Sequence, residues 1–261
     1  MSLKSVNLYS LYTSSKLKIS DFREYEKILS KRNKANSVGE REKGSLYYLV
    51  EDLLENGCQV NGLENFYYSY TIPHIGKEFD LLKIGKENVL NIELKSENVG
   101  LERIKTQLLC NFKYLKYLSK KMYLFTFISD IKKYYRLNEA SELVECDVTE
   151  VLDVIKLFDS NDSLEIDRLF KANDFLVSPI STPQKFINEN YFLTTQQEFI
   201  KSKLFSSLEQ NTYFKINGEA GTGKTLLLFD IGTERNRHNS MTPHFLLSLP
   251  FHPNQQYPVS R

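Results

Sequence analysis

Two groups of polar residues in this 261-residue chain have the types and the spacing that phosphate chemistry needs. The first group is Asp80, Glu93 and Lys95, which stand inside two neighbouring hydrophobic stretches. The second is the glycine-rich stretch 218–225, which reads Gly-Glu-Ala-Gly-Thr-Gly-Lys-Thr. The first group is suited to cutting a phosphodiester, and the second is suited to binding a polyphosphate.

Glu93 and Lys95 stand two residues apart, so their side chains point to the same face of a strand. Asp80, on a paired strand, can converge on the same point, where two carboxylates bind a hard divalent cation. Such a cation polarises a phosphodiester and lowers the pKa of a bound water, which a lysine can help to position. We therefore expect Mg²⁺- or Mn²⁺-dependent hydrolysis. The alternative is a solvated strand face, because Glu-x-Lys is common on exposed strands.

The elements that would position these residues follow from the hydrophobic pattern, which predicts a β-hairpin between helices. The predicted strands are 66–71, 79–84, 89–94, 122–128 and 143–146. The predicted helices around them are 39–56, a helix containing Ile104 to Leu115, and 148–158. This order predicts an α/β fold in which the hairpin carries Asp80, Glu93 and Lys95.

Asp80 followed by Glu93-x-Lys95 on such a hairpin resembles the PD-(D/E)xK nuclease superfamily, which has a restriction-endonuclease-like fold with an αβββαβ core. The resemblance implies that Asp80 and Glu93 are metal ligands and that Lys95 is catalytic. It also implies nucleic acid as the substrate, DNA before RNA, and it makes a homodimer possible because dimers are common in the superfamily.

Members of this superfamily often add an acidic ligand from the preceding helix, which makes Glu42 the third metal ligand here, with Glu40 and Glu51 as alternatives. Glu42 also has a structural interpretation, because the helix dipole favours an acidic residue in the first turn. The chain departs from related nucleases at one point. They often carry a Glu a few residues after a helix-start glycine, whereas Gly44 is followed by Leu-Tyr-Tyr at 46–48.

The helix after the hairpin carries Gln107, Asn111 and Tyr114 as a polar line. The exonuclease-like branch of the superfamily places a Gln and then a Tyr on this helix, so the resemblance implies that Gln107 is catalytic. Lysines beside aromatic residues could contact phosphates and stack on bases, although a solvated lysine face is the alternative. These residues are Lys113, Lys116 and Lys120, together with the basic and aromatic patch at 132–136.

The glycine-rich stretch fits the pattern G-x-x-x-x-G-K-[ST] of a phosphate-binding P-loop. It lies between a predicted strand at 213–216 and a predicted helix that begins near Leu226. Lys224 would reach the β- and γ-phosphates of ATP, and the Thr225 hydroxyl would bind the Mg²⁺. The residues predicted to bind ATP in this loop are Gly218, Glu219, Ala220, Gly221, Thr222, Gly223, Lys224 and Thr225.

The order of elements before the P-loop resembles the start of superfamily 1 helicases. This order is Leu193-Thr194-x-x-Gln197, a predicted helix at 196–208, a strand and then the P-loop. The resemblance is nearest to the Schlafen-like DNA/RNA helicase group, and it implies that Gln197 reads the adenine edge of ATP. After Thr225 the acidic residues are Asp230 and Glu234, and neither closes the apolar strand that normally supplies a Mg²⁺-holding carboxylate.

We therefore expect residues 191–261 to be the start of a helicase-type ATPase, in a truncated or frameshifted product that departs from the ATPase after about Ile231. ATP hydrolysis is not expected of this chain. Residues 1–160 would form the nuclease-like domain with an N-terminal helical extension, and 161–190 a connector. The function expected of the full-length form is a nuclease coupled to an ATP-driven motor. The alternatives are an ATP-binding module and a remnant without catalysis.

Charge and cysteine content limit the remaining classes of protein. A net charge of +1 gives no global attraction to nucleic acid, so any such attraction must be local. Three widely separated cysteines, Cys58, Cys110 and Cys146, form neither a zinc pattern nor a disulfide framework, which predicts a reducing cytoplasm. No apolar run is long enough for a membrane span, and no signal peptide is expected.

Overall fold

The structure, a computed structural model, describes residues 3–73, 75–159, 165–170, 177–187, 191, 193–207, 215–218 and 221–237. The chain divides into two compact units, residues Met1–Phe175 and Leu176–Arg261. Each unit is described by itself.

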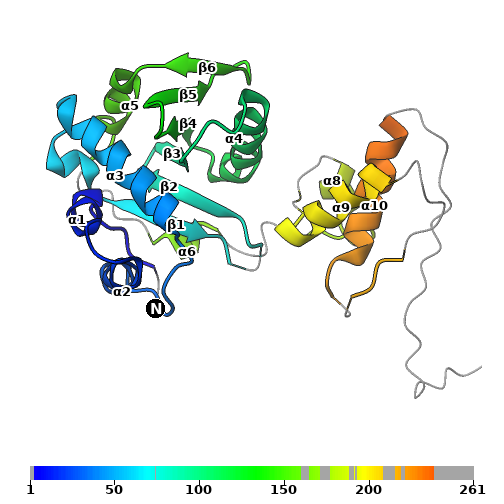
Figure 1. The fold of residues 1–261 in the computed structure, drawn as a ribbon. Helices are drawn as coiled ribbons and strands as arrows, with labels where there is room; N and C mark the ends of the chain where they lie inside the picture. Colours follow the sequence, from blue (N-terminus) through cyan, green and yellow to red (C-terminus); the bar gives the residue numbers. More distant parts are fainter. Residues whose placement is uncertain are drawn as a thin grey trace, which may run out of the picture. The chain divides into compact units, whose positions relative to one another are not determined.

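The first unit is built around a six-stranded sheet whose strands lie side by side in chain order (Figure 1). The strands are β1 Phe66–Thr71, β2 Glu78–Ile84, β3 Asn88–Lys95, β4 Lys121–Ile128, β5 Lys133–Leu137 and β6 Leu143–Cys146. The helices are α1 Leu8–Ser14, α2 Ile19–Ser30, α3 Glu40–Glu55, α4 Leu101–Leu115, α5 Val148–Ile155 and α6 Ile166–Leu169, with short 3₁₀ turns at Val60–Leu63 and Lys116–Leu118.

All neighbouring strands of the sheet are antiparallel except β3 and β4, which are parallel from Asn88↔Lys121 to Lys95↔Ile128. A parallel pair needs a crossover connection, and α4 provides it. The predicted α/β fold is confirmed as a mixed α/β sheet structure. The predicted strands and helices on either side of the hairpin also occur, with ends shifted by up to a few residues.

The strand β5 was not predicted, because its residues were interpreted as a basic and aromatic patch. Tyr134 and Tyr135 of this strand are buried, and the Tyr134 ring lies 4.8 Å from that of Phe127 on β4. These two tyrosines therefore pack inside the protein and do not form a surface for stacking bases.

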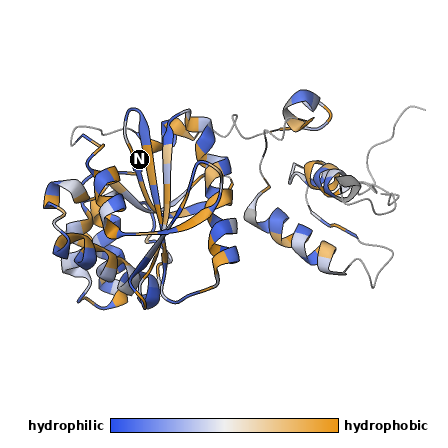
Figure 2. Ribbon diagram, turned by 90° about the horizontal axis from the view of Figure 1, so that it is seen from above, coloured by the Kyte–Doolittle hydropathy of each residue, from blue (hydrophilic) through white to orange (hydrophobic). Residues whose placement is uncertain are grey.

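The two faces of the sheet are covered by different helices (Figure 1). Helices α1, α3 and α5 pack on one face and enclose the main hydrophobic core, in which Leu46, Leu49, Val50 and Leu53 of α3 are almost completely buried. Helix α4 lies on the other face, against β4. Both the strands and the helices carry hydrophobic and polar residues (Figure 2). Most residues of β1 to β4 are nevertheless buried, as expected for a sheet covered on both sides.

The backbone of β1 is irregular at Ser69, whose φ of 49° lies in the left-handed region. The Tyr67 and Tyr70 rings are 6.2 Å apart, although residues three apart on a regular strand point to opposite faces. Tyr68 and Tyr70 pair with Leu81 and Phe79 of β2, the two residues that flank Asp80. The irregular backbone of β1 therefore lies next to the first candidate catalytic residue.

A buried ion pair holds this irregular backbone in place. The Glu26 carboxylate is fully buried and accepts hydrogen bonds from Arg32 Nε at 2.9 and 3.0 Å and from Asn36 Nδ2 at 2.9 Å. Arg32 Nη2 in turn donates to the carbonyl oxygen of Tyr68, the residue before Ser69. Burial raises the pKa of Glu26, and the Arg32 charge acts against that rise.

The second unit contains α8 Pro183–Ile187, α9 Thr195–Ser207 and α10 Lys224–Arg237. Its apolar cluster is formed by Leu193, Leu204, Leu226, Leu227 and Ile231. The predicted strand at 213–216 lies partly outside the described residues, and its described residues Lys215 and Ile216 are not in a strand. Within the described parts of the chain, no helix has the length and apolar character needed to cross a membrane.

Replacing Arg32 tests the role of the buried ion pair. Arg32→Ala would leave the Glu26 carboxylate buried without its counter-charge, so we expect the free energy of unfolding to fall by about 3–5 kcal/mol at pH 7. Urea denaturation followed by circular dichroism measures this change. The control is Lys156→Ala, which breaks an exposed ion pair with Asp153 and should cost less than about 1 kcal/mol. Equal effects of the two substitutions would contradict the role of Arg32.

Candidate active site

The hairpin places Asp80 and Glu93 next to each other. Leu81 of β2 pairs with Ile92 of β3, and Asp80 and Glu93 are the next residues beyond this pair. The backbone N–H of Leu94 donates to Asp80 Oδ2 at 2.8 Å. The Asp80 carboxylate therefore lies against the backbone of β3, between the candidate residues Glu93 and Lys95.

Glu93 is buried in a set of amide side chains. It is only 2% exposed, and its Oε1 accepts hydrogen bonds from Asn111 Nδ2 at 2.7 Å and from Asn91 Nδ2 at 3.2 Å. Its Oε2 accepts from Gln107 Nε2 at 3.3 Å. Helix α4 thus contributes Asn111 and Gln107, and β3 contributes Asn91. The alternative of a solvated strand face is wrong for Glu93.

Counting acceptor positions shows which oxygens of the two carboxylates can still bind a ligand. Each carboxylate oxygen can accept about two hydrogen bonds. Oε1 of Glu93 already has two donors, whereas Oε2 has one. Asp80 Oδ2 binds the Leu94 N–H, and no hydrogen bond to Oδ1 is found among the described residues. Glu93 Oε2 and Asp80 Oδ1 are therefore the oxygens available to a cation.

These oxygens suit a hard divalent ion that keeps part of its water shell. Mg²⁺ is commonly held by one or two carboxylates, with water completing its coordination. Among the described residues, no three His, Cys, Asp or Glu side chains are grouped as ligands of one ion. The residues fit a Mg²⁺ or Mn²⁺ bound by Asp80 and Glu93, with the other ligands supplied by water or substrate.

The electrostatics of the site favour a bound cation. Burial, and then the neighbouring Glu93 charge, raises the pKa of Asp80 well above its ordinary value of 3.8. The Lys95 charge lowers this pKa and the Glu42 charge raises it, which puts both residues within electrostatic reach of Asp80. Lys95 is partly exposed and makes no ion pair with a described residue.

Glu42, the candidate third ligand, lies in the first turn of α3. Its Oε2 accepts the backbone N–H of Gly39 at 2.9 Å, so it caps the helix as the structural interpretation requires. Ligation by Glu42 stays a prediction. The alternatives have other partners, since Glu40 pairs with Lys43 at 2.7 Å and Glu51 accepts the Tyr47 hydroxyl at 2.8 Å.

Asn91 and Asn111 were not predicted as site residues, although both are fully buried beside Glu93. Two signals could have found them. Asn91 is a polar residue in an apolar strand, two positions before Glu93, and Asn111 lies four positions after Gln107. Tyr114, by contrast, is only 4% exposed, so it is not a surface on which a base can stack.

A cavity of about 720 Å³ adjoins the site at the carboxyl ends of β3 and β4. Its floor is joined to the backbone of Lys95, because the Ser129 N–H donates to the Lys95 carbonyl oxygen at 2.8 Å. The Ser129 and Ser45 hydroxyls are hydrogen-bonded at 3.1 Å. The cavity is lined by Arg41, Gly44, Ser45, Tyr48, Ser96, Ser129, Asp130, Ile131 and Lys132.

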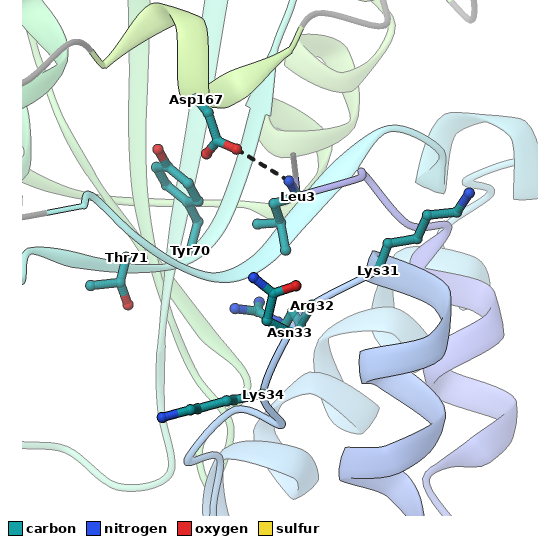
Figure 3. A pocket seen from close by; sticks show the side chains of 8 residues that line it. All are labelled: Leu3, Lys31, Arg32, Asn33, Lys34, Tyr70, Thr71 and Asp167. Carbon is teal, nitrogen blue, oxygen red and sulfur yellow. Dashed lines mark hydrogen bonds between the residues drawn. The ribbon is translucent and has the colours of Figure 1, made fainter. Parts of the chain in front are cut away.

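A smaller cavity, of about 240 Å³, lies between the loop after α2, the end of β1 and Asp167 (Figure 3). The Leu3 N–H donates to Asp167 Oδ2 across it at 3.3 Å. Figure 3 shows that Lys31 and Lys34 extend in different directions, so their charges do not converge on one anion. This cavity therefore has no evident part in phosphate binding.

The P-loop residues that the structure describes lead into the start of α10. Gly221 and Gly223 have φ of 80° and 75°, which only glycine adopts at little cost. Lys224 Nζ donates to the Gly218 carbonyl oxygen at 2.8 Å, and Thr225 is the second residue of the helix. Glu219 and Ala220 lie outside the described residues.

Gln197, predicted to read adenine, is bonded to the loop itself. Its Nε2 donates to the Thr222 carbonyl oxygen at 3.1 Å, and its Oε1 accepts the Thr194 N–H at 2.8 Å. Gln197 is only 8% exposed. Contact with adenine therefore stays a prediction, and it would require these hydrogen bonds to be exchanged.

Comparisons of this chain with models of protein families, with curated proteins and with solved structures find no match. The site is therefore interpreted from its own geometry and chemistry.

The raised pKa of Asp80 gives a testable pH dependence. A carboxyl group whose pKa is higher in the folded state stabilises the fold only when protonated, so this contribution is present below pH 3.8 and is lost as the pH rises through the folded pKa. Asp80→Asn should therefore raise the free energy of unfolding at pH 7 and lose this advantage near pH 4. Urea denaturation in a chelator over a series of pH values measures the effect.

The matched control for this pH series is Asp153→Asn, which removes an exposed carboxylate on α5. Its effect should be small at every pH. If the wild type is more stable than Asp80→Asn at pH 7, the carboxylates of Asp80 and Glu93 do not repel each other in the folded protein.

Proposed function

We propose that the first unit is a metal-dependent nuclease that cleaves phosphodiester bonds in nucleic acid, DNA before RNA. One observation carries the proposal: Asp80 and Glu93 lie next to each other on the hairpin, each with a carboxylate oxygen whose acceptor positions are not all filled by described donors, and Lys95 lies within electrostatic reach. Two carboxylates and a lysine in this arrangement have the chemistry that phosphodiester hydrolysis needs.

Each residue has a defined part in this proposal. Asp80 and Glu93 hold Mg²⁺ or Mn²⁺, which when bound polarises the scissile phosphate and lowers the pKa of an attacking water. The Lys95 ammonium balances the charge that develops on the phosphate. Gln107 holds Glu93 in position through its hydrogen bond. Glu42 lies at the edge of the site and is proposed as a further ligand, directly or through water.

The topology supports this interpretation at the level of the fold. The order α3, β1, β2, β3, α4, β4 follows the αβββαβ order of the restriction-endonuclease-like core, including a parallel β3–β4 pair joined by a helix. The carboxylates stand on the second and third strands of this order. The resemblance to the PD-(D/E)xK superfamily is thus supported by the spatial arrangement of its motif residues.

A second candidate function is nucleotide binding by the second unit. It is favoured by the left-handed glycines before α10 and by Lys224, whose ammonium binds a carbonyl of its own loop. ATP phosphates would replace this carbonyl as the partner of Lys224 and would lie at the positive end of the helix dipole. In a longer form of the protein, this unit would couple nuclease action to an ATP-driven helicase-like motor.

Cleavage assays test the nuclease proposal. The full chain should cut labelled DNA, and RNA more slowly, in Mg²⁺ or Mn²⁺ and not in EDTA. Asp80→Ala should reduce cleavage to background because a metal ligand is lost. Lys95→Ala should reduce the rate by about 100-fold or more, as expected for a residue that acts on the reacting phosphate.

The controls for these assays are Asp153→Ala, which removes an exposed charge on α5, and Lys27→Ala, which removes a partly exposed charge on α2. Both should cleave like the wild type. Equal cleavage by the wild type, Asp80→Ala and Lys95→Ala would identify a contaminating nuclease and end the proposal.

Equilibrium binding of a fluorescent ATP analogue tests the second function. Lys224→Ala should weaken binding by about tenfold or more, because a charged hydrogen bond to phosphate contributes about 1.5–3 kcal/mol. Lys203→Ala, an exposed lysine on α9, should leave binding unchanged. If Lys224→Ala binds the analogue as tightly as the wild type, the loop does not hold phosphates.

A further inference from the structure

The large cavity beside Lys95 has walls from three elements of the first unit. Helix α3 contributes Tyr48 and Gly44, the end of β3 contributes Ser96, and the turn after β4 contributes Ile131. Because Ser96 directly follows Lys95, the cavity lies one residue from the candidate catalytic lysine. Lys95 shares the face of Glu93, which contacts α4, whereas the cavity is lined from α3, so a substrate strand would pass from Lys95 to the cavity across the carboxyl end of β3.

Tyr48 offers an exposed aromatic ring in a fixed position. Tyr48 is 45% exposed, and its ring lies 5.5 Å from that of Tyr47 with the planes at 82°. Tyr47 is itself stacked on Tyr12 at 4.9 Å and donates its hydroxyl to Glu51. Ile131 is a second exposed apolar side chain of the lining.

Gly44 leaves space that another residue could have filled. Glycine in the interior of a helix costs about 0.5–1 kcal/mol relative to alanine. A Cβ atom built on Gly44 meets no heavy atom within 4 Å, so packing does not require glycine at this position of α3. The missing side chain instead keeps the cavity open next to Tyr48.

The polar groups of the cavity suit a base better than a phosphate. Asp130 would repel a phosphate, but its carboxylate can accept a hydrogen bond from an amino group of a base. The hydroxyls of Ser45, Ser96 and Ser129 can donate or accept. Basic residues stand at the rim, where Arg41 and Lys132 make long ion pairs of 3.6 and 3.9 Å that exposed phosphates can replace.

We propose that this cavity binds an unpaired nucleobase next to the cleavage site, stacked on Tyr48, while Arg41 and Lys132 contact the phosphates on either side. The inference rests on the proposed nuclease function for its substrate class. It assigns the first unit a preference for single-stranded or locally opened nucleic acid, because a base inside a duplex cannot enter the cavity.

Binding of a fluorescein-labelled single-stranded DNA to the full chain in EDTA tests this assignment without cleavage. Gly44→Phe fills the cavity from a position with free space, and Tyr48→Ala removes the stacking ring. Each should weaken binding about tenfold, since stacking of one base contributes about 1–3 kcal/mol. Gly44→Ala is the matched control and should bind like the wild type. Thermal unfolding checks that all variants are folded.

A blunt-ended DNA duplex without unpaired bases serves as the second probe. Its weaker binding should be the same for the wild type, Gly44→Phe and Tyr48→Ala. The assignment is overturned if both variants bind single strands like the wild type. It is also overturned if they lose as much affinity for the paired duplex, because the cavity would then contact backbone and not a base.

The two proposals can fail separately. If cleavage depends on Asp80 and Lys95 but Gly44→Phe and Tyr48→Ala bind single strands like the wild type, the base site is ruled out. The nuclease proposal then stands. If these variants bind single strands more weakly but no Asp80-dependent cleavage is found, the nuclease proposal is ruled out. The cavity is then a binding surface for single strands.

Discussion

A carboxylate buried at the centre of a sheet must be surrounded by hydrogen-bond donors, and this constraint governs the first unit. Glu93 satisfies it with three amide side chains, two of which come from α4. An unpaired buried charge would cost several kcal/mol, so α4 can pack on the sheet only with Gln107 and Asn111 turned inward. The crossover helix is thus held to the sheet by polar contacts as well as by Ile104, Leu108 and Leu115.

The same arrangement limits what the site can bind. The amide groups occupy most acceptor positions of Glu93, and the Leu94 N–H occupies one oxygen of Asp80. The pair is therefore fixed in orientation before any ion arrives, while its mutual repulsion is left uncompensated. A binding site prepared in this way binds a cation at little cost in ordering.

The local parts of this site could be predicted from sequence, whereas the parts brought together by the fold could not. Alternation on a strand placed Glu93 and Lys95 on one face, and the hairpin pattern placed Asp80 beside them. The positive φ of Ser69 could not be predicted from the sequence, because serine rarely adopts a positive φ. Asn111 became part of the site only through the packing of α4 on β3. Strand β5 was missed because its lysine, arginine and two tyrosines resemble a surface patch.

The contact between the Ser45 and Ser129 hydroxyls joins residues that are 84 positions apart in the chain. Asp80, Glu93 and Lys95 are all synthesised before Ser129, which binds the Lys95 carbonyl and completes the cavity floor. Contacts of such long sequence separation require a large loss of chain entropy before they form. During translation the chain therefore carries the carboxylates of the proposed metal site before the cavity beside them is complete, and the candidate site forms only when β4 joins the sheet.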